Sequence, residues 1–196
     1  MDINKIKEKL QVSMTINGKV HKRYYHSLEV AKMAVELVEH HKLNIDQDNA
    51  YLAGLLHDAT KLIAKDVQKK MLYDLGYTDD DEIMASSNVW HGETAVEYIK
   101  KEYNINNEEI LSAVKYHVMG RPNMSELEKV IFISDYVERT RVGEVFDKAR
   151  EIAFISLDKA LVYILESQIK YINSLNEPLI SNTLLTYEYY KKENNS

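Results

Sequence analysis

Apolar residues recur every three or four positions along this chain, and little interrupts them. The 196 residues include only two prolines, Pro122 and Pro178, and six glycines. A spacing of three and four matches the repeat of an α-helix, whereas a half-buried strand alternates every two residues. The sequence therefore predicts one helix after another, and we expect the fold class to be all-α, in the form of a helical bundle.

Capping residues predict where several of these helices begin and end. A side-chain oxygen just before a helix accepts hydrogen bonds from its free N–H groups, and a glycine after it supplies a turn that stops it. A central helix is expected after His21, because apolar stripes cover more than half of its circumference. The other predicted boundaries are Asp46 or Asp48 before AYLAGLLHD, Asn106 and Gly120 around EEILSAVKYHV, Ser125 with Glu128 as a capping box, and about Ser156 to Asn176 for the last long helix.

The composition excludes several classes of protein. There is no cysteine, so a metal site must use His, Asp and Glu, which favours iron, manganese or zinc. The net charge of −6 argues against a surface that coats nucleic acid. No apolar stretch approaches the roughly 18 residues of a membrane span, and the start, MDINKIKEKL, lacks the apolar centre of a signal peptide. We therefore expect a cytoplasmic protein that binds neither nucleic acid nor membrane.

Polar residues stand at unusual places in these apolar helices. His57 and Asp58 end the run AGLLHD, Asp135 lies in KVIFISDYV, His117 in ILSAVKYHV, and His91 follows the only tryptophan. A single such histidine is more often a hydrogen-bonded core residue than a ligand. Several helices that each direct a His or Asp inward are, however, how helical bundles build metal sites, because the cation offsets the desolvation of the carboxylates.

This reasoning predicts a metal site with mixed nitrogen and oxygen ligands, which suits iron or manganese. The predicted ligands come from three helices and are His26, His57, Asp58 and Asp135. Cations that lie near them in sequence are candidates for binding a phosphorylated substrate, namely Arg23, Lys61 and Arg141. Three further histidines are assigned to helix ends and left out of the site: His21, His40 and His41.

The order of these residues resembles a known family. His26, the pair His57-Asp58 and Asp135 are similar to the H…HD…D signature of the HD-domain metal-dependent phosphohydrolases. The strings RYYHSLEVA, AGLLHDATK, WHGETA and YHVMGRPNMSELEKVIFISDYVE resemble, over most of the chain, the YqeK group, which is known as symmetrical diadenosine tetraphosphate hydrolases. The HD pair is short and shared by many activities, whereas the stretch around YHVMGRPNMSELEK is much more specific.

The resemblance implies an HD-domain helical bundle that holds one or two iron ions at the four ligands above, with manganese or zinc as alternatives. It implies that His91 and His117 bind a second metal or contact phosphate. Arg23, Lys61 and Arg141 match nucleotide-side residues, and Ser181, Asn182 and Thr183 match a segment that closes over the nucleotide. Arg139 stands where the family pattern has a proline, so the loop that leads to Arg141 is expected to differ in shape.

The expected reaction is attack of metal-activated water on an inner phosphorus of diadenosine tetraphosphate, which gives two molecules of ADP. Asp58, His57 and Asp135 are the candidate catalytic residues, and Asp58 or Asp135 would orient the water. No covalent nucleophile is apparent, since the chain lacks cysteine and a GxSxG motif.

Three alternative functions remain open at this point. The chain could be another HD phosphohydrolase that acts on a nucleoside monophosphate, a deoxynucleoside triphosphate or a guanosine alarmone. It could also be a nucleotide-binding sensor without turnover, or a helical scaffold with metal-free polar pairs in its core. The expected partner is a small-molecule nucleotide substrate, and a homodimer is the association considered between copies of the chain.

A single domain is expected from the length. Within residues 1–196 we expect an N-terminal helix over 1–20, a metal-binding core over 21–145, C-terminal helices and the closing segment over 146–190, and a frayed tail over 191–196. The tyrosines of TYEYYKK are expected to pack this end onto the bundle; they are Tyr187, Tyr189 and Tyr190.

Overall fold

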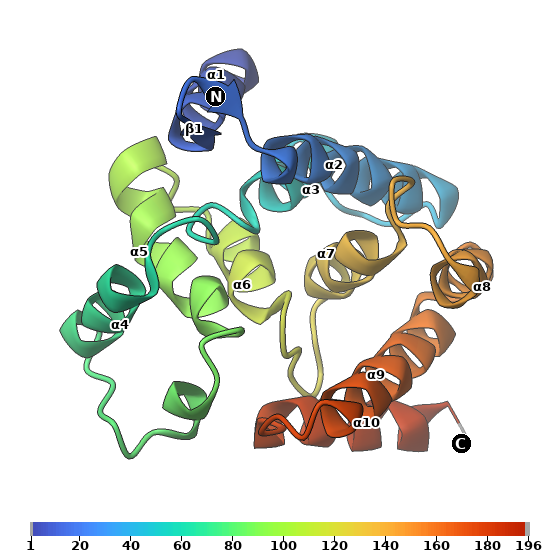
Figure 1. Cartoon of the computed structure of the whole chain (residues 1–196). Coiled ribbons are helices and arrows are strands. Elements are labelled where there is room, and N and C mark those ends of the chain that lie inside the picture. The colour runs from blue at the N-terminus through green and yellow to red at the C-terminus, as the bar shows by residue number, and fades with distance from the viewer. Residues whose placement is uncertain (1, 195–196) are drawn as a thin grey trace.

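The protein is described by a computed structural model that covers residues 2–194, and its elements are almost entirely helical (Figure 1). The all-α prediction is therefore confirmed. In chain order the elements are α1 (Ile3–Ser13), β1 (Thr15–Ile16), β2 (Lys19–Val20), α2 (Lys22–His40), α3 (Gln47–Leu56), α4 (Lys65–Asp74), the 3₁₀ helix η1 (Glu82–Ala85), α5 (Trp90–Tyr103), α6 (Glu108–Tyr116), α7 (Glu126–Val137), α8 (Glu144–Ala153), α9 (Leu157–Ser174) and α10 (Ser181–Glu193).

The N-terminal segment corrects one prediction. The helix expected over 1–20 ends at Ser13, and the antiparallel strands β1 and β2 follow it. Asn17 and Gly18 form the turn between the strands, and both have positive φ, of 50° and 73°. Asn-Gly is the dipeptide that a two-residue hairpin turn prefers, because it accepts this left-handed backbone. A hairpin therefore replaces the last part of the predicted helix.

The predicted caps are confirmed at most helix ends. Asp46 caps α3 by accepting a hydrogen bond from the backbone N–H of Asn49, and Ser125 and Glu128 form the capping box of α7. At α6 the cap is Asn107, one residue after the predicted Asn106. The last long helix begins as expected, after its cap Ser156, and ends at Ser174, two residues early.

The three histidines that we assigned to helix ends lie there. His21 is the N-cap of α2, and its Nδ1 accepts a hydrogen bond from the backbone N–H of Arg23. His40 and His41 end the same helix and reach across to the end of α8. Their Nε2 atoms lie 2.7 Å from the carbonyl oxygens of Phe154 and Ala153 respectively. These rings therefore satisfy free carbonyl groups at a helix C-terminus.

Helices α2, α3, α6 and α7 pack around a shared apolar core (Figure 1). Met33 and Leu37 of α2, Leu52 and Leu55 of α3, and Phe132 of α7 are among its fully buried side chains. Burying a side chain of this kind contributes about 1.5–3 kcal/mol. The core therefore fixes α2, α3 and α7 relative to one another, and these are the three helices from which the metal ligands were predicted.

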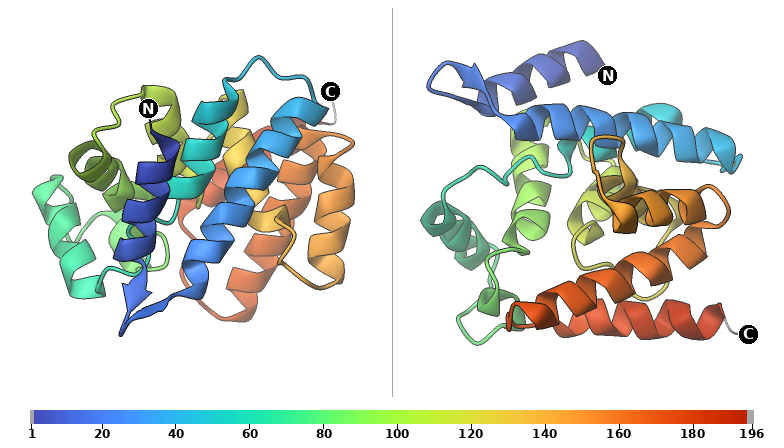
Figure 2. Two further views of the ribbon diagram at one scale, coloured as in Figure 1. Left: turned by 90° about the horizontal axis from the view of Figure 1, so that it is seen from above. Right: turned by 45° about the vertical axis from the view of Figure 1, so that its right-hand side comes forward.

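The C-terminal helices α9 and α10 lie side by side along one edge of the bundle (Figure 2). Tyr190 is buried, Tyr187 and Tyr189 pack against the core, and the backbone N–H of Met124 donates a hydrogen bond to the Tyr190 hydroxyl at 2.7 Å. The predicted packing of this end is confirmed. Helix α10 continues to Glu193, so the tail predicted to fray from residue 191 is helical for three more residues, and 195–196 lie outside the described residues.

No helix within residues 2–194 combines the length and the apolar character that a bilayer crossing requires.

Candidate metal centre

The four predicted ligands meet at one point of the bundle. His26 comes from α2, His57 and Asp58 follow α3 directly, and Asp135 comes from α7. His26 Nε2 lies 3.0 Å from Asp135 Oδ1 and 4.0 Å from Asp58 Oδ2. His57 Nε2 lies 3.5 Å from Asp58 Oδ2 and 3.8 Å from Asp135 Oδ1. The structure thus brings together all four residues that the sequence assigned to the metal.

The consecutive pair His57-Asp58 reaches the same site because α3 ends there. The helix stops at Leu56, and His57 is its C-cap residue. Neighbouring side chains on a regular helix point about 100° apart, which would separate the two ligands. His57 keeps helical backbone angles at this helix end, and its Nε2 lies 3.5 Å from Asp58 Oδ2, so the two side chains converge beyond the last turn of α3.

His91 and His117 form a second group of ligand-type atoms around the same Asp58. His91 Nε2 lies 3.3 Å from Asp58 Oδ1, His117 Nε2 lies 3.9 Å from that oxygen, and the two Nε2 atoms are 3.2 Å apart. His91 is the second residue of α5 and His117 follows α6, so two more helices contribute to the centre. The Asp58 carboxylate directs one oxygen to each group.

Two glycines allow the helices that carry these residues to approach closely. A Cβ on Gly54 of α3 would lie 2.8 Å from the Cα of Ala31 in α2, and one on Gly92 of α5 would lie 2.7 Å from the carbonyl oxygen of Lys115 in α6. Distances this short are not tolerated between backbones, so any larger residue would push the helices apart. Gly54 thus sits at the crossing that joins His26 to His57.

The ring nitrogens indicate that this cluster suits a cation. The Nδ1 atoms of His57 and His117 lie 2.6 Å from the carbonyl oxygens of Gly54 and Val114, so each Nδ1–H is used as a donor. The Nε2 atoms then carry lone pairs and point inward. Among residues 2–194, the buried Nε2 atom of His57 has no hydrogen-bond partner, and the carboxylate oxygens of Asp58 and Asp135 lie 3.5 and 3.8 Å from it. Orphaned acceptors beside carboxylates are what a divalent metal satisfies.

Burial keeps three of the rings neutral. It lowers the pKa of His57, sets that of His91 well below its usual range, and lowers that of His117 to about 4. A neutral imidazole offers the lone pair that a metal ligand needs. The donors of the second group are therefore in the protonation state that binds a cation at neutral pH.

The carboxylates and His26 show that the cluster favours positive charge. Burial on its own would raise the pKa of Asp58 and of Asp135, but the groups around them, including Arg23 beside Asp58 and both His26 and Arg141 beside Asp135, outweigh it and hold both below the usual range. Burial also opposes the charged form of His26, yet hydrogen bonds to Asp135 and Glu138 raise its pKa to about 9. Two ionised carboxylates at one point are the charge pattern that a divalent cation would neutralise.

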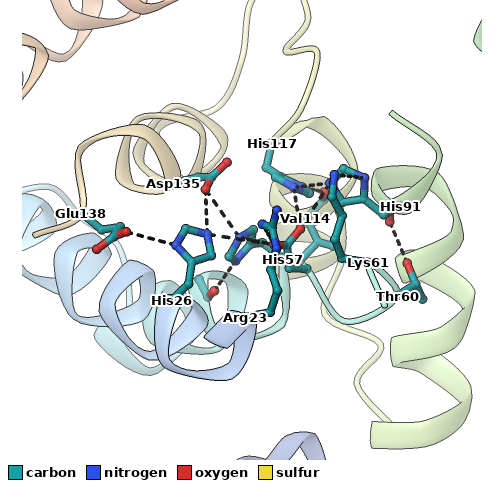
Figure 3. A network of polar contacts seen from close by, with 12 residues as sticks. Arg23, His26, His57, Thr60, Lys61, His91, Val114, His117, Asp135 and Glu138 are labelled. Carbon is teal, nitrogen blue, oxygen red and sulfur yellow. Dashed lines mark hydrogen bonds and ion pairs between the residues drawn. The ribbon is translucent and has the colours of Figure 1, made fainter. Parts of the chain in front are cut away.

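The three predicted phosphate-binding cations border the cluster, and Figure 3 shows two of them, Arg23 and Lys61. Arg23 Nη1 donates to Asp58 Oδ2 at 2.6 Å, and Arg141 Nη2 donates to Asp135 Oδ1 at 2.9 Å. Lys61 Nζ lies 3.2 Å from His91 Nδ1. Arginine and lysine in these places neutralise negative charge next to the metal ligands.

Two cavities adjoin this arrangement. The first, which we call the α2 cavity, measures about 440 Å³ and is lined by Arg23, Tyr25 and His26 of α2 together with Glu138 and residues 140–141. It opens directly onto a predicted metal ligand. The second, the α9 cavity, measures about 430 Å³.

The α9 cavity lies between the end of α9 and the loop before α5. Asn88, Gln168, Tyr171 and Thr183 are among its lining residues. The carbonyl oxygen of Asn88 accepts a hydrogen bond from Lys61 Nζ at 3.3 Å, which connects this cavity to the cluster.

The predicted closing segment reaches only this second cavity. Thr183 lines it, whereas the Ser181 hydroxyl and backbone N–H bind Glu82, and the Asn182 side chain donates to the carbonyl oxygen of Gly120. Within residues 2–194 none of the three side chains hydrogen-bonds to the metal cluster. Ser181 and Asn182 therefore hold the start of α10 against Glu82 and Gly120 in this structure.

Glu138 is a site residue that the sequence analysis missed. It follows the last residue of α7, its side chain is 1% exposed, and its Oε1 lies 3.1 Å from His26 Nδ1. The signal that was available is its spacing of three residues from Asp135, which places both on one side of the helix end. The neighbouring Arg139, which replaces an expected proline, binds Glu36 on the outer face of α2.

Comparisons with known proteins agree with this geometry. A family model described as the HD domain matches residues 23–140. The chain is 36% identical over 173 residues to "Bis(5'-nucleosyl)-tetraphosphatase, symmetrical" of Staphylococcus aureus, covering 86% of this chain and 87% of the relative. The protein of the same name from Bacillus subtilis is 30% identical over 172 residues, covering 85% and 88%. A crystal structure described as a predicted HD superfamily hydrolase involved in NAD metabolism, from Clostridium acetobutylicum, has a TM-score of 0.90 at 33% identity and covers 98% of both chains.

The fold and the site are those of the HD-domain proteins, a family of metal-dependent phosphohydrolases. The chain belongs to this family and, within it, to the group of the symmetrical bis(5'-nucleosyl)-tetraphosphatases. The HD-domain bundle and the family resemblance read from the sequence are therefore confirmed.

Proposed function

We propose that the chain is a metal-dependent hydrolase that splits diadenosine tetraphosphate in the middle and releases two molecules of ADP. The observation that carries this proposal is the Asp58 carboxylate. Its Oδ2 lies 3.5 Å from His57 Nε2 and its Oδ1 lies 3.3 Å from His91 Nε2, so one side chain can serve two cation positions. Arginines and a lysine border these positions, as a polyphosphate substrate requires.

Two overlapping sets of residues would hold the metals. One set is His26, His57, Asp58 and Asp135, and the other is Asp58, His91 and His117. Nitrogen and carboxylate donors accept iron, manganese or zinc, and we propose iron, which the family resemblance implies. When bound, such an ion polarises a phosphoryl oxygen and lowers the pKa of water so that hydroxide is available near neutral pH.

The reaction adds one water molecule across the central P–O–P bridge. The water oxygen bonds to one inner phosphorus, the bond from that phosphorus to the bridging oxygen breaks, and the bridging oxygen leaves with the other ADP. Arg23, Arg141 and Lys61 would offset the phosphate charge that otherwise repels the incoming oxygen. Asp58 or Asp135 would orient the water, since both carboxylates face the centre.

We assign the two ends of the substrate to the two cavities. The α2 cavity and the α9 cavity measure about 440 and 430 Å³, and volumes of this size are usual for sites of small ligands. Residues 181–183 would close the α9 cavity, where Thr183 lines the wall. In this proposal residues 21–145 hold the metals, and the C-terminal helices complete one nucleoside site.

The test is anaerobic incubation with diadenosine tetraphosphate in ¹⁸O-labelled water, with Fe²⁺ or Mn²⁺ supplied and Asp58→Ala as the control. ADP is expected as the only product, with label in half of the ADP molecules and no turnover by the variant. AMP together with ATP would contradict the central cut. Binding of metal without turnover would contradict hydrolysis of this substrate and favour a nucleotide sensor.

A panel of nucleotides distinguishes the remaining alternatives. Faster turnover of a nucleoside monophosphate, a deoxynucleoside triphosphate or a guanosine alarmone would identify a different HD phosphohydrolase. The homodimer, which sedimentation would measure, and the cytoplasmic location stay predictions.

A further inference from the structure

Glu138 is a charged residue placed where it can act on the metal centre without reaching it. It is 1% exposed and follows α7, three residues after Asp135. Its Oε1 lies 3.1 Å from His26 Nδ1, on the side of the ring opposite to the cluster (Figure 3). A buried carboxylate is costly unless its oxygens are hydrogen-bonded, so these contacts explain why it is retained.

The contact with Glu138 determines how His26 presents its ring. Glu138 can only accept when ionised, so Nδ1 of His26 carries the proton that is donated to it. Its Nε2 faces the cluster, 3.0 Å from Asp135 Oδ1, so Nε2 is the atom that would give up its proton and offer a lone pair when a metal binds. A carboxylate behind a ligating histidine fixes the tautomer and the ring orientation and raises the basicity of the ligand.

Glu138 also holds the loop that carries Arg141. The backbone N–H of Thr140 donates to Oε2 at 2.6 Å, and the Thr140 hydroxyl donates to Oε1 at 2.6 Å. Arg150 Nη2 donates to the carbonyl oxygens of Glu138 and Arg141, both at 3.0 Å. One carboxylate therefore joins a metal ligand on α2 to the loop whose arginine contacts Asp135.

We infer that Glu138 is a positioning residue of the metal centre, which sets the tautomer of His26 and couples that ligand to the Arg141 loop. The inference rests on the metal-binding part of the proposed function. It assigns a role to a residue that would not bind the metal itself and whose side chain borders the α2 cavity.

The experiment compares Glu138→Gln with the wild-type chain and two matched variants. Glutamine keeps the shape of the side chain but removes its charge. If its carbonyl oxygen takes the place of Oε1 beside His26, its NH₂ group faces the backbone N–H of Thr140, which needs an acceptor. Glu128→Gln is the control for burial, because Glu128 lies on the same helix and is also 1% exposed. Thr140→Val removes the hydroxyl contact to the loop and leaves the pair with His26 in place.

The readout is the dissociation constant for Mn²⁺ and for Zn²⁺, measured by competition with a chelator, with circular dichroism as the check of folding. Loss of an outer partner of a metal ligand typically costs about 10–100-fold in affinity, and this is expected for Glu138→Gln. The two control variants are expected to stay within about threefold of the wild type, since neither removes a partner of a metal ligand.

A second measurement needs no variant and so does not depend on folding of the mutant. Long-range ¹H–¹⁵N NMR of the Zn²⁺-loaded wild-type chain should show His26 protonated at Nδ1 and metal-bound at Nε2. The inference is overturned by the opposite tautomer, or by metal affinity of Glu138→Gln equal to that of Glu128→Gln. Failure of the wild-type chain to bind either metal would overturn the proposed function as well, which separates the two failures.

Discussion

Helix α7 has a buried glutamate at each end, and the two differ in what surrounds them. Glu128 and Glu138 are both 1% exposed. Glu128 Oε2 accepts a hydrogen bond from the backbone N–H of Ser125 at 2.9 Å and pairs with Arg121 at 3.0 Å, and its Oε1 contacts Ser112. Its partners therefore belong to the N-cap of the helix, to the loop before it and to α6.

Glu138, at the other end, has partners that belong to the metal centre. It contacts the ring of His26 and the loop that positions Arg141. Burial and residue type are the same at both ends, so neither distinguishes a structural carboxylate from a functional one. The partners make that distinction, and substitutions at the two ends of α7 should separate stability from activity.

The largest effect is expected from Asp135→Asn, which removes a carboxylate ligand near the functional end. The ratio kcat/KM for diadenosine tetraphosphate should fall by more than about 100-fold. This exceeds the loss of about 10–100-fold that is typical when a residue hydrogen-bonded to a metal ligand is removed. The unfolding temperature in a chelator should change by less than about 3 °C, because asparagine keeps the shape. Steady-state kinetics and a thermal melt check this, and a loss of activity below tenfold would contradict it.

Arg141→Ala is expected to have the next largest effect. Arg141 is the cation nearest Asp135, and removal of one preorganised donor to developing charge commonly lowers kcat about 100-fold. The metal dissociation constant should change far less than kcat does. Parallel chelator competition and kinetics measure the two quantities, and an equal change in both would place Arg141 in metal binding instead.

Glu128→Ala tests the opposite end of the helix. It removes the capping box and leaves the Arg121 side chain without its buried partner, which should lower the free energy of unfolding by about 1–3 kcal/mol. Activity per folded molecule should stay at the wild-type value. Urea unfolding and active-site titration provide these numbers, and a specific loss of turnover would show that the comparison between the two glutamates fails.

The smallest effect is expected from Arg121→Ala. The Arg121 side chain is 34% exposed, so solvent screens much of its interaction with Glu128. The free energy of unfolding should fall by about 1 kcal/mol or less, with kcat unchanged. Arg121 thus serves as the counterpart of Arg141: each arginine pairs with an acidic residue of α7, and only Arg141 should alter catalysis.

Much of the fold and most of the metal cluster can be predicted from the sequence, for different physical reasons. Helices are predictable because apolar spacing and caps such as Asp46 act locally. The ligands are predictable because a histidine or carboxylate in an apolar run is costly without compensation. The order of His26, the HD pair and Asp135 also matches the signature of a family. This match indicates that these polar residues of different helices belong to one site.

The remainder depends on contacts between distant segments. Glu138 directly follows α7, and in the sequence it resembles an ordinary surface residue. Its role becomes visible only from its contact with His26 of α2. Gly54 matters because of the backbone of Ala31, which no local pattern reports. The hairpin at Asn17-Gly18, in contrast, carried a local signal that the helical spacing around it obscured.

The central claim is that the buried histidines and aspartates form a metal centre, and thermal unfolding with and without metal tests it most directly. The wild-type chain would be melted in chelator and again with Mn²⁺ at about 1000 times its dissociation constant, which adds about 4 kcal/mol to stability. For a chain of this length that predicts a rise of about 10 °C, absent in His57→Ala. No rise in the wild type, with His57→Ala as stable as the wild type in both conditions, would contradict the claim and indicate a metal-free polar core.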